Sequence, residues 1–153
     1  MRLNATFGGL FVALALAGCG SSAKPTPHFA AIADTICTNA DGAIAALPPE
    51  GTSLPSLART AARELPIVRA ELSQLAELTA PASKANAFAR ALASTRRETA
   101  LVARLLAALR AGQASRIASL ALEGRVVDTQ AKTAMTTLGL DACAREAAPR
   151  SQP

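Results

Sequence analysis

Three cysteines and a single histidine are the residues whose types could support the most specific chemistry. The cysteines are Cys19, Cys37 and Cys143, and the histidine is His28. Thiolates and imidazole bind zinc, but a structural zinc site needs more ligands than these, and the cysteines are not paired as C-x-x-C. No G-x-S-x-G sequence accompanies His28 to form a hydrolase triad. We therefore predict no catalytic residues, no metal ligands and no cofactor.

Two glutamates of one predicted helix, Glu64 and Glu71, are the remaining candidates for acid–base chemistry. Their spacing places them on one helix face but two turns apart, about 10 Å along the axis. Arginines lie close to both in the sequence, and the charged residues of an amphipathic helix usually face solvent. We interpret both glutamates as surface charges. The sequence also contains no glycine-rich phosphate loop, H-E-x-x-H or EF-hand pattern, so we expect a protein without enzymatic activity.

Three arginines at seven-residue spacing, Arg90, Arg97 and Arg104, stack along one face of a helix. They form either an ordinary solvent face or a contact surface for anionic lipid headgroups or an acidic protein. The chain carries 16 Lys and Arg against 11 Asp and Glu, a formal net charge of +5. Because aromatic residues that stack on bases are scarce, we expect no binding to nucleic acid.

The first residues of the chain predict an export signal. Arg2 supplies a positive start, and residues 7–18 form an uncharged, mostly apolar stretch too short to span a bilayer comfortably. The residues that end it are apolar or small and lead directly into a cysteine: Leu16, Ala17, Gly18 and Cys19. This ending resembles the lipobox of bacterial lipoproteins. The resemblance implies removal of residues 1–18, acylation of Cys19 and attachment to the extracytoplasmic face of the cell membrane, or to the outer membrane in a Gram-negative cell.

Behind the lipidated cysteine, residues 19–27 are rich in Gly, Ser and Pro and are typical of a flexible tether. Eight extended residues span at most about 28 Å, so the folded part would stay near the membrane. We predict a single helical domain over residues 28–144 and a disordered tail over residues 145–153.

Four segments with apolar residues at three- and four-residue steps make up this domain, at about residues 28–47, 54–79, 81–111 and 114–139. The apolar residues expected to face the core in the first segment are Phe29, Ile32, Ile36, Ala40 and Ile44. Thr95 and Thr99 interrupt the third apolar stripe, and their hydroxyls are expected to bond to backbone carbonyls one turn earlier. Alanine-rich segments with short connections favour an all-α fold, an up-down bundle of about four helices.

Individual residues refine the helix boundaries. Ser53 is a suitable N-cap for the second helix, and Pro81 suits the first turn of the third. Pro66 lies inside the second helix and predicts a kink near Ala62 or a break into two helices. Gly124 lies on the apolar stripe of the fourth helix, where it would allow a neighbouring helix to approach closely.

The pair Cys37 and Cys143 remains once Cys19 is acylated, an even number of thiols in an exported chain. If the first and fourth helices are antiparallel neighbours, the tail of the chain returns to Cys37. We therefore predict a disulfide that joins the first helix to the C-terminal tail. Two buried free thiols, a redox-active pair and half of a metal site are the alternatives.

The lipobox, the alanine-rich helices and the ending from Leu138 to Cys143 resemble small lipoproteins of high-GC, actinobacterial-type bacteria. The resemblance implies a location and a helical shape, and it carries no catalytic residues. We expect a membrane-anchored, non-enzymatic module that binds a protein partner or modulates the cell envelope. The alternative is a helical bundle that binds an apolar small ligand between its helices.

Overall fold

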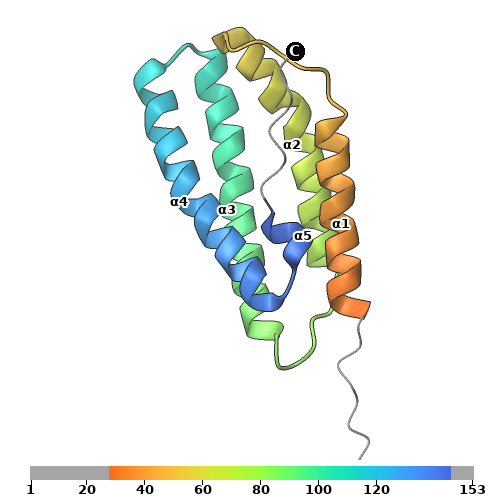
Figure 1. Cartoon of the computed structure of the whole chain (residues 1–153). Helices are drawn as coiled ribbons and strands as arrows, with labels where there is room; N and C mark the ends of the chain where they lie inside the picture. The colour runs from red at the N-terminus through yellow and green to blue at the C-terminus, as the bar shows by residue number, and fades with distance from the viewer. Residues whose placement is uncertain (1–27, 146–153) are drawn as a thin grey trace, which may run out of the picture.

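A computed structural model describes residues 28–145 of the chain, and this part folds into four long helices and one short one (Figure 1). No strand occurs among these residues. The all-α prediction is therefore confirmed. The helices are α1 (His28–Ala45), α2 (Leu54–Ala76), α3 (Ala85–Arg110), α4 (Ala114–Leu138) and α5 (Asp141–Ala144).

The ends of α2 and α4 follow from local chemistry. Ser53 caps α2, because its side-chain oxygen accepts a hydrogen bond from the backbone N–H of Ser56 at 3.3 Å. Gly139 ends α4 in the left-handed conformation, with φ at 72°. The backbone N–H of Leu140 then bonds to the carbonyl of Met135 at 3.0 Å, which gives a free carbonyl of the last turn a partner.

The expectation for Pro81 is wrong, and of the two alternatives expected at Pro66, a kink or a break into two helices, the break does not occur. Pro81 precedes α3 instead of starting it, because its carbonyl accepts a bond from the N–H of Lys84 in a separate turn and the helix begins at Ala85. Pro66 does not break α2, which runs through it as a single helix. The packing of residues on both sides of Pro66, including Leu65 and Leu75, holds the helix together across the missing donor.

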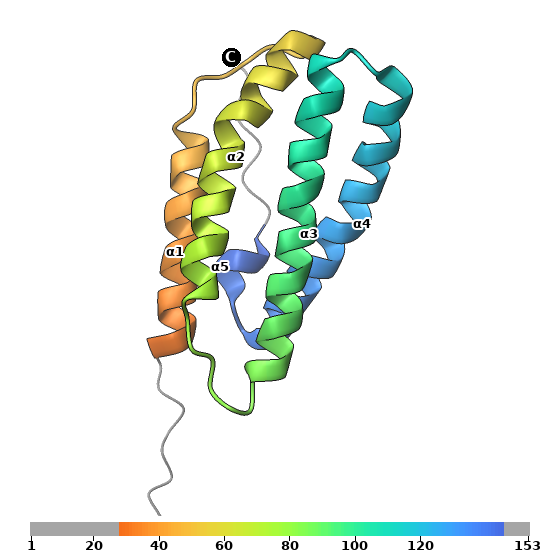
Figure 2. The same cartoon turned by 180° about the vertical axis from the view of Figure 1, so that it is seen from behind.

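The four long helices run up and down, and each packs against the next one in sequence (Figures 1 and 2). The expected contact between the first and fourth helices is absent, because the backbones of α1 and α4 do not approach each other. The short helix α5 contacts both of them instead. The ring of helices is therefore closed at one end by α5, an element that the sequence did not predict.

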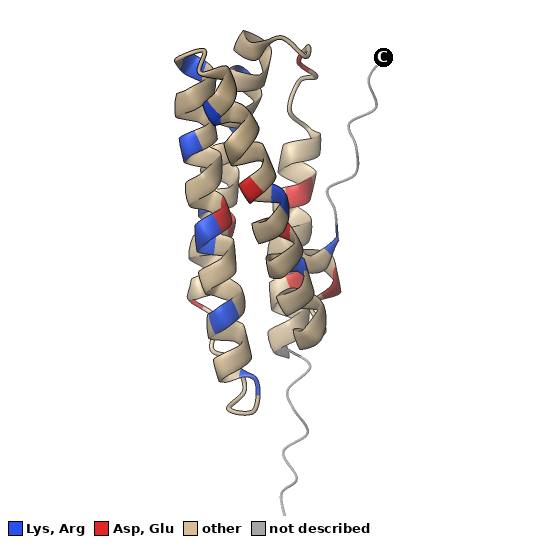
Figure 3. Cartoon of the chain, turned by 90° about the vertical axis from the view of Figure 1, so that its left-hand side faces the viewer, with Lys and Arg blue, Asp and Glu red and all other residues tan. Residues whose placement is uncertain are grey.

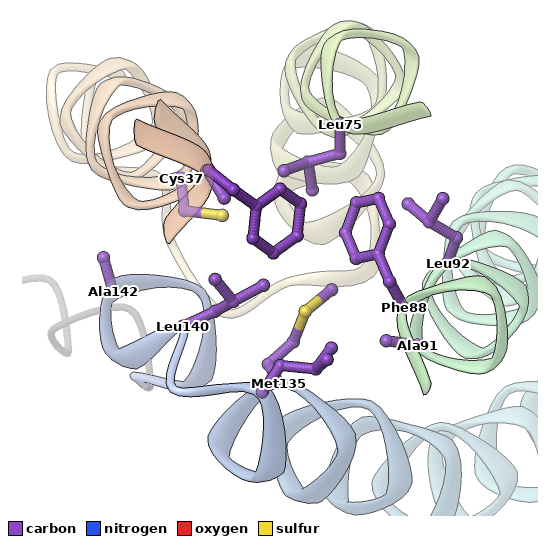
Figure 4. Close-up of a cluster of buried hydrophobic side chains, with 11 residues drawn as sticks. Cys37, Leu75, Phe88, Ala91, Leu92, Met135, Leu140 and Ala142 are labelled. Atoms are coloured by element: carbon purple, nitrogen blue, oxygen red, sulfur yellow. The ribbon is translucent and has the colours of Figure 1, made fainter. Parts of the chain in front are cut away.

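The largest hydrophobic cluster lies at the end of the bundle where α5 closes the ring (Figure 4). Phe29 of α1 and Phe88 of α3 meet edge to face, with their ring centroids 5.0 Å apart. The buried face of α1 passes through Ala33 and Cys37 instead of Ile32 and Ile36, which are only partly buried. These small side chains let α5 pack closely against α1. The buried face is therefore displaced by one residue at these two positions, whereas Phe29 and Ala40 are buried as predicted.

Two smaller clusters lie at the opposite end of the bundle. One joins α2 to α3 through Ala61, Leu65, Leu106 and Leu109, and the other joins α3 to α4 through Leu101, Ala108, Leu120 and Val127. The close approach expected at Gly124 is wrong, because a Cβ atom placed there would meet no atom within 4 Å. Leu120 and Val127, about one turn away on either side, make the buried contacts with α3 instead.

Candidate functional site

The predicted disulfide is present in the structure. Cys37 of α1 is bonded to Cys143 of α5, with Cα atoms 5.1 Å apart and a sequence separation of 106 residues. The prediction of a bridge from the first helix to the C-terminal end is confirmed. Cys19, the predicted site of acylation, lies with Leu16, Ala17, Gly18 and the predicted tether outside the described residues.

A second connection fixes the same end of α5. The backbone N–H of Ala142 donates a hydrogen bond to Oδ1 of Asp34 at 2.9 Å. The side chains of Leu140 and Ala142 are buried beside it. Asp34 lies almost one turn before Cys37, so a carboxylate and a disulfide hold α5 against the same part of α1.

The arginine row lies on the exposed surface of α3, where Arg90, Arg97 and Arg104 are all solvent-accessible. Figure 3 shows Lys and Arg along the helices of this side of the bundle. Arg104 approaches Glu123 of α4, with an N–O distance of 3.5 Å. Arg90 and Arg97 have no ion pair within the described part of the chain. The row therefore has the geometry of a surface, and two of its charges are available to a partner.

A cavity of about 390 Å³ lies between the helices, between the cluster closed by α5 and the two clusters at the other end. All five helices contribute to its wall, together with Arg145 directly after α5. Its apolar lining residues are Ile44, Val68, Leu75, Val102, Ala131 and Met135. Its charged lining residues are Asp41, Glu71, Glu98, Asp128, Lys132 and Arg145. A partly open space of this size and mixed lining has the properties of a small-molecule site.

The interpretation of Glu71 as a surface charge is wrong. Its side chain lines the cavity and is only partly exposed, and its register places it between Val68 and Leu75 on the inner face of α2. Burial raises the pKa of Glu71 to about 7, with further contributions from the nearby carboxylates of Asp41 and Glu98. This carboxyl group therefore changes charge near neutral pH.

The other carboxylates of the cavity differ in how closely a positive charge approaches them. Asp128 accepts a hydrogen bond from Nζ of Lys132 at 2.8 Å, one turn along α4. Burial raises the pKa of Asp41, and the positive charge of Arg145 partly offsets that effect. Burial and the charge of Asp128 also raise the pKa of Glu98, against the influence of Lys132. Four carboxylates thus share two cations, although the chain as a whole is positively charged.

Two threonines complete the polar wall. The hydroxyl of Thr95 donates to the carbonyl of Ala91 at 3.2 Å, and that of Thr99 donates to the carbonyl of Thr95 at 2.9 Å. The expected bonds to the preceding turn are confirmed. Because each hydroxyl has a single hydrogen, both oxygens can only accept a further bond from a molecule in the cavity.

No protein-family model, curated protein or solved structure matches the chain. The assignment of a site therefore depends on the geometry alone. Within residues 28–145, no group of three or more Cys, His, Asp or Glu side chains is arranged to hold a metal ion. No helix among these residues is long and apolar enough to cross a membrane.

A sequence signal for the cavity did exist. Glu71 falls three residues after Val68 and four before Leu75, so it shares the apolar face of α2. On α3, Glu98 falls three residues after Thr95 and four before Val102, so it shares the inner face of that helix. A carboxylate at a core position of two neighbouring helices indicates an interior polar site, and this coincidence could have been found from the printed sequence.

Proposed function

We propose that this chain is a lipid-anchored extracytoplasmic protein whose helical domain binds a small molecule in the central cavity. The observation that carries the ligand-binding part is the cavity itself, about 390 Å³ and bounded by all five helices. Small-molecule sites occupy about 300 to 1,000 Å³ and frequently lie between the helices of a bundle. This function corresponds to the ligand-binding alternative among the two that the sequence suggested.

The anchoring part of the proposal depends on the sequence from Arg2 to Cys19. If Cys19 is acylated, two or three acyl chains would hold the protein stably at a membrane. Replacing Cys19→Ser should abolish labelling by a radioactive fatty acid and release the processed protein from membranes. Membrane association of the processed serine variant that still requires detergent for release would contradict this part.

The cavity can be tested with N-phenyl-1-naphthylamine, an uncharged fluorophore whose emission rises in apolar surroundings. We expect saturable binding to the whole chain carrying Cys19→Ser, a form in which no attached acyl chain competes for the cavity. Ala131 is buried and lines the cavity, so Ala131→Leu should fill part of the space and weaken binding about tenfold or more. Ala121 is exposed on the same helix, and Ala121→Leu serves as the matched control.

A second cavity variant protects the test against misfolding. Val102 lines the cavity from α3 and is only partly buried, so Val102→Leu adds volume from another side with less effect on the core. Variants are compared only where circular dichroism shows native helix content. Equal binding by wild type, Ala131→Leu, Val102→Leu and Ala121→Leu would overturn the proposed site.

A further inference from the structure

The charge balance of the cavity restricts which molecules it can accept. Its wall contains four carboxylates and two cationic groups. One cation, Lys132, is bound to Asp128, and the other, Arg145, interacts with Asp41. The charged groups that influence Glu71 are carboxylates alone, those of Asp41 and Glu98. Among residues 28–145, Glu71 is therefore the cavity carboxylate for which no counter-charge is found.

The hydrogen-bonding groups of the cavity also favour a ligand that donates hydrogen bonds, independently of its charge. The hydroxyl hydrogens of Thr95 and Thr99 are directed to backbone carbonyls, so their oxygens only accept. Carboxylate oxygens also only accept when ionised. A ligand that donates several hydrogen bonds matches this wall, whereas a ligand that only accepts would leave the acceptors unpaired.

The helical register arranges the cavity in layers. Glu71 and Glu98 lie at the middle level, with Val68 and Val102 one turn away toward one end of the bundle. Leu75, Thr95 and Met135 lie one turn away toward the end that α5 closes. A polar middle level between apolar side chains suits a molecule with one polar head and a short hydrocarbon body.

We infer that the ligand is a small organic ammonium compound with an apolar body, bound with its ammonium group between Glu71 and Glu98. This inference rests on the proposed function and adds the ligand class. A positive charge would relieve the repulsion among the carboxylates, and the N–H groups of a primary ammonium would pair with acceptors. The hydrocarbon part would lie against Val68 and Val102, where burial of apolar surface favours binding.

Three probes of equal chain length separate the charge effect from the size of the cavity: hexylamine, hexanol and hexanoate. Isothermal titration calorimetry at pH 7.5 with the whole chain carrying Cys19→Ser should show hexylamine binding at least about tenfold more tightly than hexanol. Hexanoate should bind more weakly than hexanol, because it adds a negative charge to the cavity.

Two glutamate variants assign the preference to the correct carboxylate. Glu71→Gln keeps the shape of the side chain and removes its charge, so hexylamine affinity should fall toward that of hexanol while hexanol affinity stays the same. Glu77→Gln removes one carboxylate from an exposed position directly after α2 and should leave both affinities unchanged. Glu71→Asp retains the charge and should retain part of the preference for the amine.

The outcomes distinguish the ligand class from the site. If hexanol and hexylamine bind equally and Ala131→Leu weakens both, the cavity binds ligands but the ammonium inference is wrong. An amine preference that survives in Glu71→Gln also overturns the inference. If neither these probes nor N-phenyl-1-naphthylamine binds, the proposed function fails together with it.

Discussion

The side chain of Asp34 accepts a hydrogen bond from the backbone N–H of Ala142, which lies 108 residues further along the chain. The first N–H groups of a helix have no partner within the helix, and a carboxylate is the natural acceptor for one of them. In this fold the acceptor comes from α1 instead of the residue before α5. The bond places the short helix, and with it Cys143 and Arg145, at the wall of the cavity.

Replacing Asp34→Ala should therefore lower the free energy of unfolding by roughly 1 to 3 kcal/mol, the range for a hydrogen bond that involves a charged group. Urea unfolding followed by circular dichroism measures the change. Asn39→Ala, at an exposed position of the same helix, is the control and should have an effect below about 0.5 kcal/mol. Similar losses in the two variants would mean that the bond to Ala142 does not stabilise the fold.

The disulfide between Cys37 and Cys143 should contribute more than this single hydrogen bond. It closes a loop with a sequence separation of 106 residues, for which chain entropy predicts about 4 to 5 kcal/mol of stabilisation. The double variant Cys37→Ser with Cys143→Ser should show that loss in urea unfolding. Addition of a reductant should destabilise the wild type but leave the double variant unchanged, and insensitivity of the wild type would contradict the role of the bridge.

The main features of the fold could be predicted because they depend on local patterns. The apolar periodicity located all four long helices, and α2 begins after Ser53, the N-cap expected from capping chemistry. The pairing of Cys37 with Cys143 followed from the number of cysteines in a chain that is predicted to be exported. Each of these inferences needed only neighbouring residues or a simple count.

The sequence places Glu71 and Glu98 on core faces of their helices, but it does not show that they line a cavity, because a cavity depends on how the helices are arranged in space. α1 has 18 residues, whereas α3 has 26, and α1 does not reach α4. The interior near Glu71 is therefore bounded partly by α5, a four-residue helix with no periodicity to detect. The arginines near Glu71 in the sequence suggested a solvent face, but they are absent from the wall that Glu71 meets inside the bundle.

The space beside Gly124 makes a stabilising substitution available. A Cβ atom there would meet nothing within 4 Å, and the residue lies in the interior of α4. Gly124→Ala should raise the free energy of unfolding by about 1 kcal/mol, the difference in helix propensity between the two residues. Gly139→Ala is the opposite case, because a φ of 72° at this position strains any residue with a Cβ atom. This change should lower the free energy of unfolding by about 1 kcal/mol. A loss of stability in Gly124→Ala would show that neighbouring atoms leave no room for a Cβ atom at this position.

The raised pKa of Glu71 predicts that stability falls with rising pH. A carboxyl group with a pKa of about 7 in the folded state and 4.5 in the unfolded state stays protonated up to a higher pH in the folded state. Compared with high pH, the folded state is therefore more stable at low pH. This extra stability is fully present below pH 4.5 and is lost as the pH rises through about 7. The difference is on the order of 3 kcal/mol. Asp41 and Glu98 have raised pKa values too, and they act in the same direction.

Comparison with Glu71→Gln separates this residue from the other carboxylates. The variant and the wild type should have similar stability at pH 4.5, and the variant should be the more stable at pH 8. Glu77→Gln, at the exposed end of α2, should follow the wild type throughout. Parallel pH profiles for wild type and Glu71→Gln would show that Glu71 titrates normally in the folded protein.

The arginine row on α3 is the predicted contact for an anionic surface, and vesicle binding tests it. Arg90 and Arg97 are exposed and have no ion pair in residues 28–145, whereas Arg104 is near Glu123. Each arginine close to an anionic membrane adds about 1 kcal/mol of attraction. The double change Arg90→Gln with Arg97→Gln should therefore weaken binding of the whole chain carrying Cys19→Ser to anionic vesicles by roughly ten- to thirtyfold, measured by co-sedimentation.

The matched control removes the same charge from another helix. Arg116 and Arg125 are exposed on α4, and changing both to Gln lowers the net charge equally. Gln is nearly as good a helix former as Arg, so the melting temperature should stay the same in both double variants. The difference between them should be largest at about 0.01 M salt, where the screening length is about 30 Å, and should shrink at 0.15 M, where it is about 8 Å. Equal weakening by the two variants would reduce the effect to net charge and leave the row on α3 as a solvent face.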